Sequence, residues 1–325
     1  MQKERSTCLV TGGAGFIGSH VAQRLLEQGH GVRVLDNLAT GSRENLAELG
    51  EGVEFIEGDV QDRAVCERSV DGVDVVFHLA ALGSVPRSLA DSWASHDANV
   101  NGTVRLLEAC RHGGVRRMVF SSSSSVYGDT PTLPKVETFE PLPRSPYAAS
   151  KIAGEQYVLS YARAGLLEGV ALRYFNVFGP RQSPKGAYAA VIPLFMNAAL
   201  RGTPASVNGD GGQTRDFTYV DNVVKANLLA GFGPAERVSG HPVNVGAGDR
   251  TSLNDLLQMI RDISGVNVPA DHRQPRAGDV RDSLAGMERA RAVLGYEPDV
   301  TMREGLRITW EWMLSRDREL SEARR

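Results

Sequence analysis

The chain has 325 residues, of which 42% are hydrophobic and 23% are charged, and its formal net charge is −3. These values are typical of a globular chain of about two domains, and they exclude a disordered or fibrous protein. Acidic and basic residues are interspersed without a basic stripe, so we expect no nucleic-acid partner.

The N-terminal segment "MQKERSTCLVTGG" is charged and then briefly apolar, which is not typical of a signal peptide or a membrane span. We therefore expect a cytoplasmic protein with no membrane partner. Cys8, Cys66 and Cys110 lie far apart and lack the spacing of metal ligands. Buried, reduced thiols and the absence of a metal site are the expectation.

Short apolar runs alternate with segments of helical periodicity through the first half of the chain, which predicts an α/β fold with a doubly wound parallel sheet. After "NVFGPRQSPKG" this alternation loosens into mixed helices and short strands, which predicts a smaller lobe. A later run, "HPVNVGAG", has the pattern of one more buried strand. The strands expected in the first half are residues 7–12, 31–36, 53–59, 73–80, 115–122 and 169–176.

The stretch "TGGAGFIGSH" follows the first expected strand and opens a helix. Gly12 permits a tight turn, Gly15 lets the backbone approach a pyrophosphate, and Gly18 lets the helix pack closely. Asp36 ends the next strand, 18 residues after Gly18, where a carboxylate binds ribose hydroxyls and repels a 2′-phosphate. The pattern predicts a Rossmann dinucleotide site that takes NAD. Asp59 ends the third strand, and it either reaches the adenine or caps a helix.

We assign residues 1–178 to this NAD-binding Rossmann domain and residues 179–325 to a smaller α/β substrate-binding domain. The chain is expected to return to the first domain near residues 215–247, where the extra strand falls.

"RSPYAASK" places Tyr147 and Lys151 one helical turn apart on one face. A free phenol has a pKa of about 10, and a neighbouring ammonium together with the positive nicotinamide ring favours the phenolate. Tyr147 is therefore the expected general base beside a hydride acceptor, with Lys151 also bonding the nicotinamide ribose. The serine run 121–125 ends the fifth strand, at the edge where ligands of such sheets bind. One of its hydroxyls is expected to share a proton with Tyr147.

Five motifs, "TGGAGFIGSH", "SSSSSVYG", "SPYAASK", "LRYFNVFGPRQ" and "TRDFTYVDN", together resemble the extended short-chain dehydrogenase/reductase family, in particular its nucleotide-sugar 4-epimerases. "ALGSVPRS", "GAYAAVIP" and "RTSLN" look most like bacterial UDP-N-acetylglucosamine 4-epimerases. The resemblance implies an NAD-dependent isomerase that epimerises UDP-sugars through a transient 4-keto intermediate.

The resemblance also implies roles for individual residues. The catalytic residues it implies are Ser123, with Ser124 close by, Tyr147 and Lys151. The implied cofactor contacts are Gly12, Gly15, Phe16, Ile17, Gly18, Asp36, Asn37, Asp59, Val60, Leu79, Ala80, Ala81, Asn99, Ser121, Tyr147, Lys151 and Tyr174. The implied substrate contacts are Gly83, Ser84, Ser123, Ser125, Asn176, Ala190, Val191, Asn208, Arg215, Tyr219, Arg276, Asp279 and Ser283.

Ser283 stands where relatives limited to plain hexoses carry a bulky residue beside the sugar's 2-position. Its small side chain implies that UDP-GlcNAc and UDP-GalNAc are accepted, alongside UDP-glucose and UDP-galactose. Gly286 departs from the usual aspartate of this family.

Three alternative functions use the same fold. A 4,6-dehydratase needs an Asp-Glu pair after the serine or threonine, and serines stand at those positions here. A UDP-glucuronate 4-epimerase or decarboxylase needs one donor for the sugar carboxylate, which Arg87 or Arg181 can supply. An NAD-binding module without turnover would not need the Ser, Tyr and Lys set.

The apolar faces of helices near 96–112 and 147–163 either pair in a homodimer, as the resemblance implies, or pack on the sheet.

Overall fold

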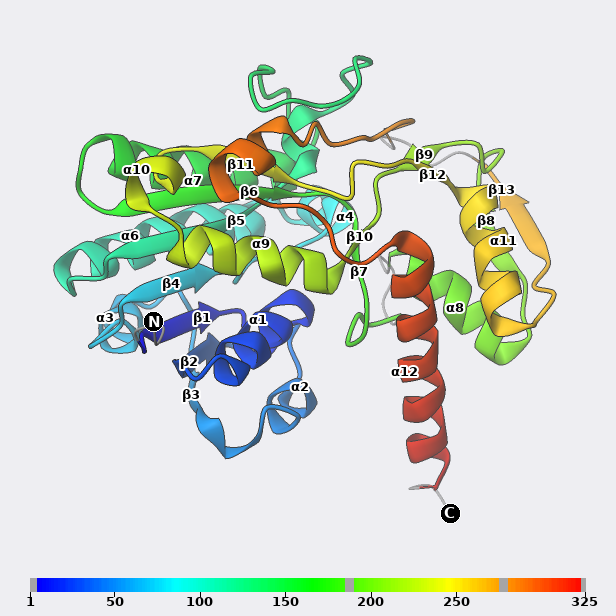
Figure 1. Ribbon diagram of the computed structural model, residues 1–325, viewed down its shortest axis with the longest axis horizontal. Helices are drawn as coiled ribbons and strands as arrows, with labels where there is room; N and C mark the ends of the chain where they lie inside the picture. Colours follow the sequence, from blue (N-terminus) through cyan, green and yellow to red (C-terminus); the bar gives the residue numbers. More distant parts are fainter. Residues whose placement is uncertain (1–4, 185–189, 275–279, 323–325) are drawn as a thin grey trace.

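The computed structural model describes residues 5–184, 190–274 and 280–322. Within these residues, seven parallel strands form one sheet in the larger lobe (Figure 1). The edge-to-edge order is β11-β6-β5-β4-β1-β2-β3, and it reverses between β1 and β4, where a crevice opens at the carboxyl ends of the strands. The predicted doubly wound α/β sheet is confirmed. The strands are β1 (Thr7–Thr11), β2 (Gly31–Asp36), β3 (Val53–Glu57), β4 (Val75–His78), β5 (Arg117–Ser123), β6 (Glu168–Tyr174) and β11 (Pro242–Val245).

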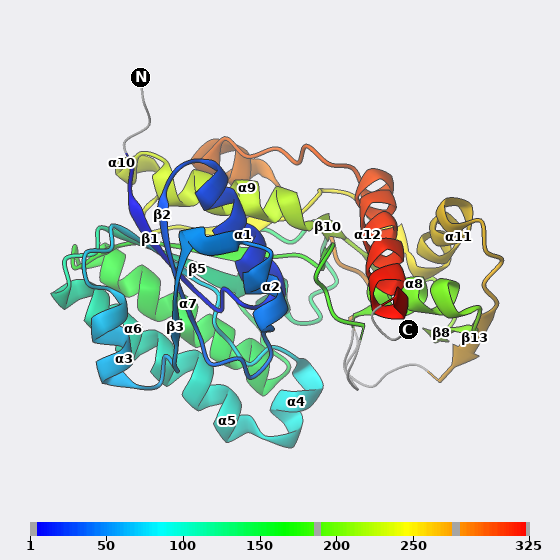
Figure 2. The same ribbon diagram turned by 90° about the horizontal axis from the view of Figure 1, so that it is seen from below.

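Helices cover both faces of this sheet, as Figure 2 shows. On one face α1 (Phe16–Glu27) packs against α9 (Val220–Phe232). On the other face lie α3 (Arg63–Ser69), α6 (Gly102–His112) and α7 (Pro146–Arg163). Shorter elements of the larger lobe are α2 (Arg43–Ala47), α4 (Val85–Ala90), α5 (Ser92–His96), α10 (Ala235–Val238) and the helical turns η1 (Gly50–Gly52), η2 (Asp97–Asn101), η3 (Ser124–Tyr127) and η4 (Ala290–Leu294).

The smaller lobe lies beyond the carboxyl edge of the sheet (Figure 1). It consists of α8 (Val191–Arg201), α11 (Leu253–Ser264), α12 (Met302–Glu322) and the parallel strands β8 (Ala205–Asn208) and β13 (Ala270–Arg273). Two short strand pairs lie at the junction of the lobes. One is the parallel pair β7 (Val177–Phe178) and β10 (Thr218–Tyr219), and the other is the antiparallel pair β9 (Thr214–Arg215) and β12 (Thr251–Ser252).

The chain crosses between the lobes more than once. After β10 it re-enters the larger lobe as α9, and β11 then pairs with β6 at the edge of the sheet, with Pro242 opposite Ala171. Residues from both sides of position 178 therefore share one sheet. The cavity described below consequently receives side chains from segments far apart in the sequence.

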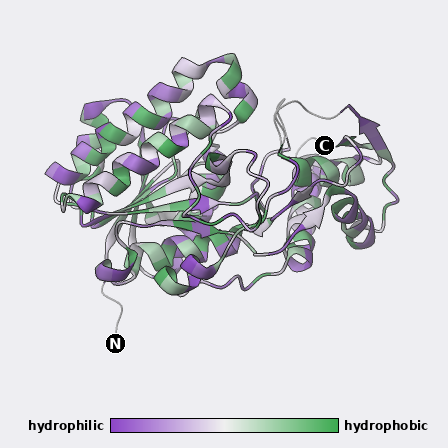
Figure 3. Ribbon diagram, turned by 90° about the horizontal axis from the view of Figure 1, so that it is seen from above, coloured by the Kyte–Doolittle hydropathy of each residue, from purple (hydrophilic) through white to green (hydrophobic). Residues whose placement is uncertain are grey.

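Hydrophobic residues face inward throughout the larger lobe. In Figure 3 the helices over the sheet alternate hydrophobic and hydrophilic residues along their length, as expected for helices with one buried face. Cys8, Cys66 and Cys110 are free and buried in this core. No helix among the described residues has the length and apolarity that a membrane span requires.

Candidate active site

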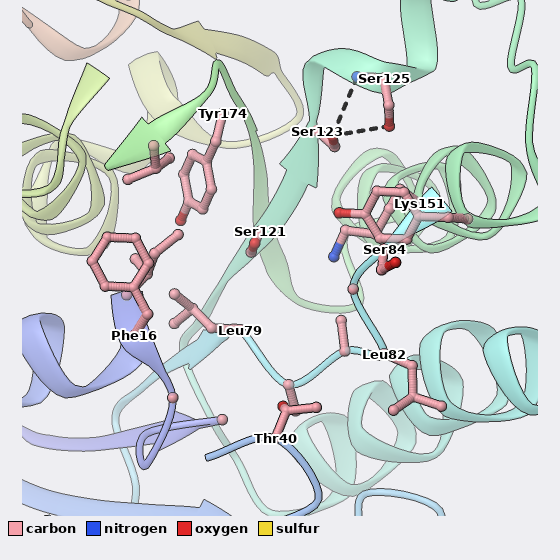
Figure 4. A pocket seen from close by; sticks show the side chains of 18 of the residues that line it. Phe16, Thr40, Leu79, Leu82, Ser84, Ser121, Ser123, Ser125, Lys151 and Tyr174 are labelled. Carbon is pink, nitrogen blue, oxygen red and sulfur yellow. Dashed lines mark hydrogen bonds between the residues drawn. The ribbon is translucent and has the colours of Figure 1, made fainter. Parts of the chain in front are cut away.

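A cavity of about 960 Å³ lies at the carboxyl ends of β1, β4 and β5. It runs from the glycine loop before α1, past the start of α7, to Val280, Asp282 and Ser283 of the second lobe. Figure 4 shows the part of the cavity around Phe16, Ser123 and Lys151. The strands bring their ends to one edge, so residues separated by more than a hundred positions line a single space.

The glycine loop has no room for side chains at two of its three motif positions. Gly12 has a φ of 69°, and a Cβ there would lie 2.7 Å from the backbone nitrogen of Ala80. A Cβ on Gly18 would lie 2.2 Å from the carbonyl oxygen of Gly12, so Gly18 lets α1 pack against the loop itself. Helix α1 begins at Phe16 without a side-chain cap. Its first N–H groups can therefore bind an anion.

Asp36 ends β2 and lines the cavity. One carboxylate oxygen accepts the N–H of Ala14 at 3.0 Å and the other accepts the N–H of Leu38 at 2.8 Å. Burial raises the pKa of Asp36, while these two hydrogen bonds lower it. The carboxylate thus also fastens the glycine loop. Asp59 lines the cavity too, and it accepts the Asn37 amide at 2.7 Å, whereas Asp62 caps α3.

Residues 121–125 at the end of β5 all line the cavity, but their hydroxyls have different partners. Ser123 and Ser125 line the cavity, and the Ser125 hydroxyl donates to the Ser123 hydroxyl at 2.9 Å (Figure 4). Ser122 is buried, and its hydroxyl donates to Glu155 at 2.6 Å. Ser124 also lines the cavity. The Ser123 side chain makes a hydrogen bond with Tyr147 that lowers the pKa of the phenol.

Tyr147 and Lys151 stand in the first turns of α7. Ser145 caps this helix by accepting the N–H of Ala148 at 3.1 Å, and Pro146 is its first residue. Burial raises the pKa of Tyr147, and the hydrogen bond from Ser123 lowers it less. The protein alone therefore does not lower this pKa, contrary to the expectation drawn from Lys151. Burial lowers the pKa of Lys151 to about 8, against the attraction of Glu155.

The substrate end of the cavity is lined from both lobes. Ser84 has a φ of 110° and caps α4 by accepting the N–H of Arg87 at 3.3 Å. Asn176 has a φ of 27°, and its amide donates to the carbonyl of Asp216 at 3.0 Å. Ser283 completes the wall, and its N–H donates to Thr214 at 3.2 Å.

Comparisons with known proteins agree with this geometry. Residues 8–246 match the model of the "NAD dependent epimerase/dehydratase family". The chain belongs to this family. It is 44% identical over 308 residues to a "UDP-glucose 4-epimerase" of Mycolicibacterium smegmatis, covering 94% of this chain and 97% of that protein.

Two further members of the epimerase/dehydratase family show the range of the relatives. A solved "UDP-N-acetylglucosamine 4-epimerase" of Methanobrevibacter ruminantium, in complex with UDP-N-acetylmuramic acid, is 39% identical with a TM-score of 0.91, covering 97% of this chain and 100% of that one. A "UDP-N-acetyl-alpha-D-glucosaminuronate decarboxylase" of Bacillus cytotoxicus is 35% identical, covering 95% of this chain and 98% of that protein. The predicted family is confirmed.

The glycine loop fits NAD, the cofactor of this epimerase/dehydratase family. Gly12 and Gly18 leave the loop backbone bare, the N-terminus of α1 is open to a pyrophosphate, and Asp36 disfavours a 2′-phosphate. All predicted cofactor contacts except Asn99 line the cavity. Asn99 lies behind the lining, where it accepts the N–H of Leu82 at 2.7 Å and donates to the Ser150 hydroxyl at 2.9 Å. It supports the loop that carries Ala80 and Ala81.

Most of the predicted substrate contacts also lie together. Gly83, Ser84, Ser123, Ser125, Asn176, Ala190, Arg215 and Ser283 line the cavity. Val191, Asn208 and Tyr219 lie outside the lining, because the first two sit in α8 and β8, and the Tyr219 ring packs against Phe178 at 5.7 Å between ring centroids. Arg276 and Asp279 fall outside the described residues. The roles of all these residues stay predictions.

The structure adds lining residues that the sequence analysis did not assign. Gln182 directly follows the "GPR" of a quoted motif, so a signal for it existed. Lys135 had none, because the bridge between Lys135 and Ala285 brings it there from a long loop. Two arginines are candidate hydrogen-bond donors to a sugar carboxylate. Arg87 lines the cavity, whereas Arg181 donates to Glu48 and Gln23, each at 2.7 Å.

Proposed function

We propose that this chain is an NAD-dependent UDP-sugar 4-epimerase that interconverts UDP-GlcNAc with UDP-GalNAc and also UDP-glucose with UDP-galactose. The observation that carries the proposal is the placing of Ser123, Tyr147 and Lys151 in one cavity with the glycine loop and Ser283. Family membership and the two epimerases among the relatives support it.

In this proposal Tyr147 removes the proton of the sugar 4-hydroxyl, and Ser123 shares that proton through its hydrogen bond to the phenol. Bound NAD supplies the acceptor for the hydride from C4. Lys151 holds the nicotinamide ribose and favours the phenolate. The 4-keto sugar, anchored through its UDP, turns over in the cavity. It would then regain the hydride at C4 on its other face, while Tyr147 returns the proton to the 4-oxygen.

The second lobe holds the UDP in this proposal. Arg215 binds the diphosphate, because a planar guanidinium makes paired, charge-assisted hydrogen bonds with it. Asn176 also binds the diphosphate. Ala190 lines the nucleotide end of the cavity. Ser283 leaves space beside the sugar's 2-position. Arg276 and Asp279 would add to this set from outside the described residues.

The test is to incubate the purified protein, without added NAD, separately with UDP-GlcNAc, UDP-glucose and UDP-glucuronate. The configuration at C4 is followed by NMR. We expect UDP-GalNAc from UDP-GlcNAc, since cofactor that is regenerated at each turnover stays bound. Tyr147→Phe should abolish turnover and still bind NAD, and full activity of that variant would contradict the proposed base.

A uronate epimerase or decarboxylase is the second candidate, and one observation favours it. Arg87 lines the cavity, and its guanidinium has no hydrogen-bond or salt-bridge partner among the described residues, so it can bind a sugar carboxylate. The same experiment separates the candidates. Release of carbon dioxide, or C4 inversion confined to UDP-glucuronate, would support the second. No change in any sugar would instead support an NAD-binding module without turnover.

The same proposal includes a homodimer in the cytoplasm. Tyr157 on α7 is 44% exposed, and Leu89 and Trp93 on the neighbouring α4 and α5 are 66% and 74% exposed. Large apolar side chains gathered on one face favour a second copy related by a two-fold axis. A solution mass of twice 35.1 kDa would support the dimer, and a mass of 35.1 kDa would contradict it.

A further inference from the structure

A carboxylate that is not part of the cavity lining lies behind Tyr147 and Lys151. Glu155 follows Lys151 by one turn on the buried face of α7, and its side chain is fully buried. Along the helix axis it is about 6 Å from Lys151 and about 12 Å from Tyr147, at about 1.5 Å per residue. A buried charge of this kind needs partners, and the neighbouring strands supply them.

Both oxygens of Glu155 are hydrogen-bonded. Arg173 on β6 binds it twice, with Nε at 3.0 Å and Nη2 at 2.6 Å, and the Ser122 hydroxyl donates at 2.6 Å. The third arm of Arg173 donates to the Tyr127 hydroxyl at 2.9 Å. Tyr127 in turn donates to Asn244 on β11 at 2.6 Å. Glu155 thus ties α7 to the strand that carries the catalytic serine.

Lys151 is differently placed. Only 3% of it is exposed, and its ammonium lies 4.8 Å from the centre of the Phe120 ring. Among the described residues, no hydrogen bond to this ammonium is present. Figure 4 shows its nitrogen facing the cavity on the side of Ser84. Its donors are therefore directed at the cavity, and Glu155 is the carboxylate that attracts its charge.

The other titratable groups that face this cluster do not stabilise the Lys151 ammonium. His78 on β4 is buried between Thr11 and Thr103, and burial lowers its pKa to about 3, so it stays neutral. Tyr127 has a pKa raised to about 12 by burial and is neutral as well. Glu137 interacts electrostatically with Arg173 and Tyr127, but it pairs with Arg289 at 4.0 Å and accepts the N–H of Asn244 at 2.7 Å, so its charge is balanced outside this cluster.

The buried cluster therefore consists of two cations, Lys151 and Arg173, and one anion, Glu155, which leaves one net positive charge. An ionised Tyr147 would neutralise it. Without the carboxylate, two cations would share one dry site, and Lys151 would lose its proton because Arg173 cannot.

We propose that Glu155 is a positioning residue that keeps Lys151 protonated and thereby sets the pH at which Tyr147 ionises. The catalytic purpose of this role rests on the proposed function, whereas the test below does not require epimerase activity. Glu155 is closer to Lys151 than to Tyr147, so it stabilises the ammonium more than it opposes the phenolate.

The test is an ultraviolet titration of the Tyr147 phenolate in the NAD-bound protein, with the Tyr147→Phe spectrum subtracted. Glu155→Gln and Arg173→Met break the same ion pair, but only the first removes the negative charge. We expect Glu155→Gln to raise the pH at which the phenolate appears by about one unit or more. Arg173→Met should leave it in place or lower it.

Unfolding of Glu155→Gln does not end the test, because an unpaired Arg173 is costly when buried. Glu155→Gln with Arg173→Met removes both charges at similar volume, and its comparison with Arg173→Met alone isolates the loss of the carboxylate. The phenolate of the double variant should appear at a higher pH than that of Arg173→Met. Equal shifts in Glu155→Gln and Arg173→Met, or the same phenolate pH in the double variant as in Arg173→Met, would overturn the inference. A protein without epimerase activity whose phenolate shifts as expected would refute the proposed function and keep the role of Glu155.

Discussion

Ser283 is the residue whose size bears most directly on the choice of sugar. It is nearly buried in the cavity wall, and its backbone is held through Thr214. A tyrosine there would fill the space proposed for the N-acetyl group. We expect Ser283→Tyr to lower kcat/KM for UDP-GlcNAc by about tenfold more than for UDP-glucose. Ser283→Ala should keep both activities. Equal losses on both sugars in the tyrosine variant would contradict the proposed role of Ser283 in the choice of sugar.

The sequence predicts the position of a residue best where its neighbours are local. Gly12, Gly18 and Asp36 fall within one strand–helix–strand unit, so their spacing determines their geometry. The sequence did not reveal that Asp36 also holds Ala14, because a hydrogen bond to a loop leaves no periodic pattern. It also did not show that the Ser122 hydroxyl donates to the buried Glu155.

The turn between β1 and α1 is the element on which cofactor binding depends most. A methyl group on Gly18 would meet the Gly12 carbonyl at 2.2 Å, and backbone at that distance must move. Gly18→Ala is therefore expected to lose most of its bound NAD, measured as cofactor per chain after purification. Gly31→Ala is the matched control, since its Cβ would meet its nearest neighbour at an ordinary 3.6 Å. Full retention of NAD by Gly18→Ala would contradict the assignment of this turn.

Elements of the second lobe were harder to place, for a physical reason. Val191, Asn208 and Tyr219 were expected in the cavity, yet their strands and helix turn them elsewhere, because their direction depends on how distant segments pair. Lys135 enters the cavity wall through pairing with residues about 150 positions later. Local propensity carries no signal for such pairing.

At the scale of the whole molecule, Asp216 joins the segments that meet between the lobes. It is fully buried directly after β9, and its carboxylate accepts the N–H groups of Ala247 at 2.8 Å, Gly248 at 3.0 Å and Ala285 at 3.1 Å. These donors come from the end of β11 and from the segment that carries Ser283. One side chain thus connects the sheet to the substrate end of the cavity.

This connection should give the stability of the protein a pH dependence of known sign. Burial raises the pKa of Asp216 from 3.8 to about 6, so between these values the folded state binds more protons than the unfolded state. The contribution is therefore fully present below 3.8 and is lost as pH rises through about 6. From about pH 7 to about pH 5 the wild-type chain should gain about 1 kcal/mol relative to Asp216→Asn, which cannot titrate. Urea unfolding of both proteins at the two pH values measures this difference. No gain toward pH 5 would show that the three N–H donors outweigh burial and hold the carboxylate ionised.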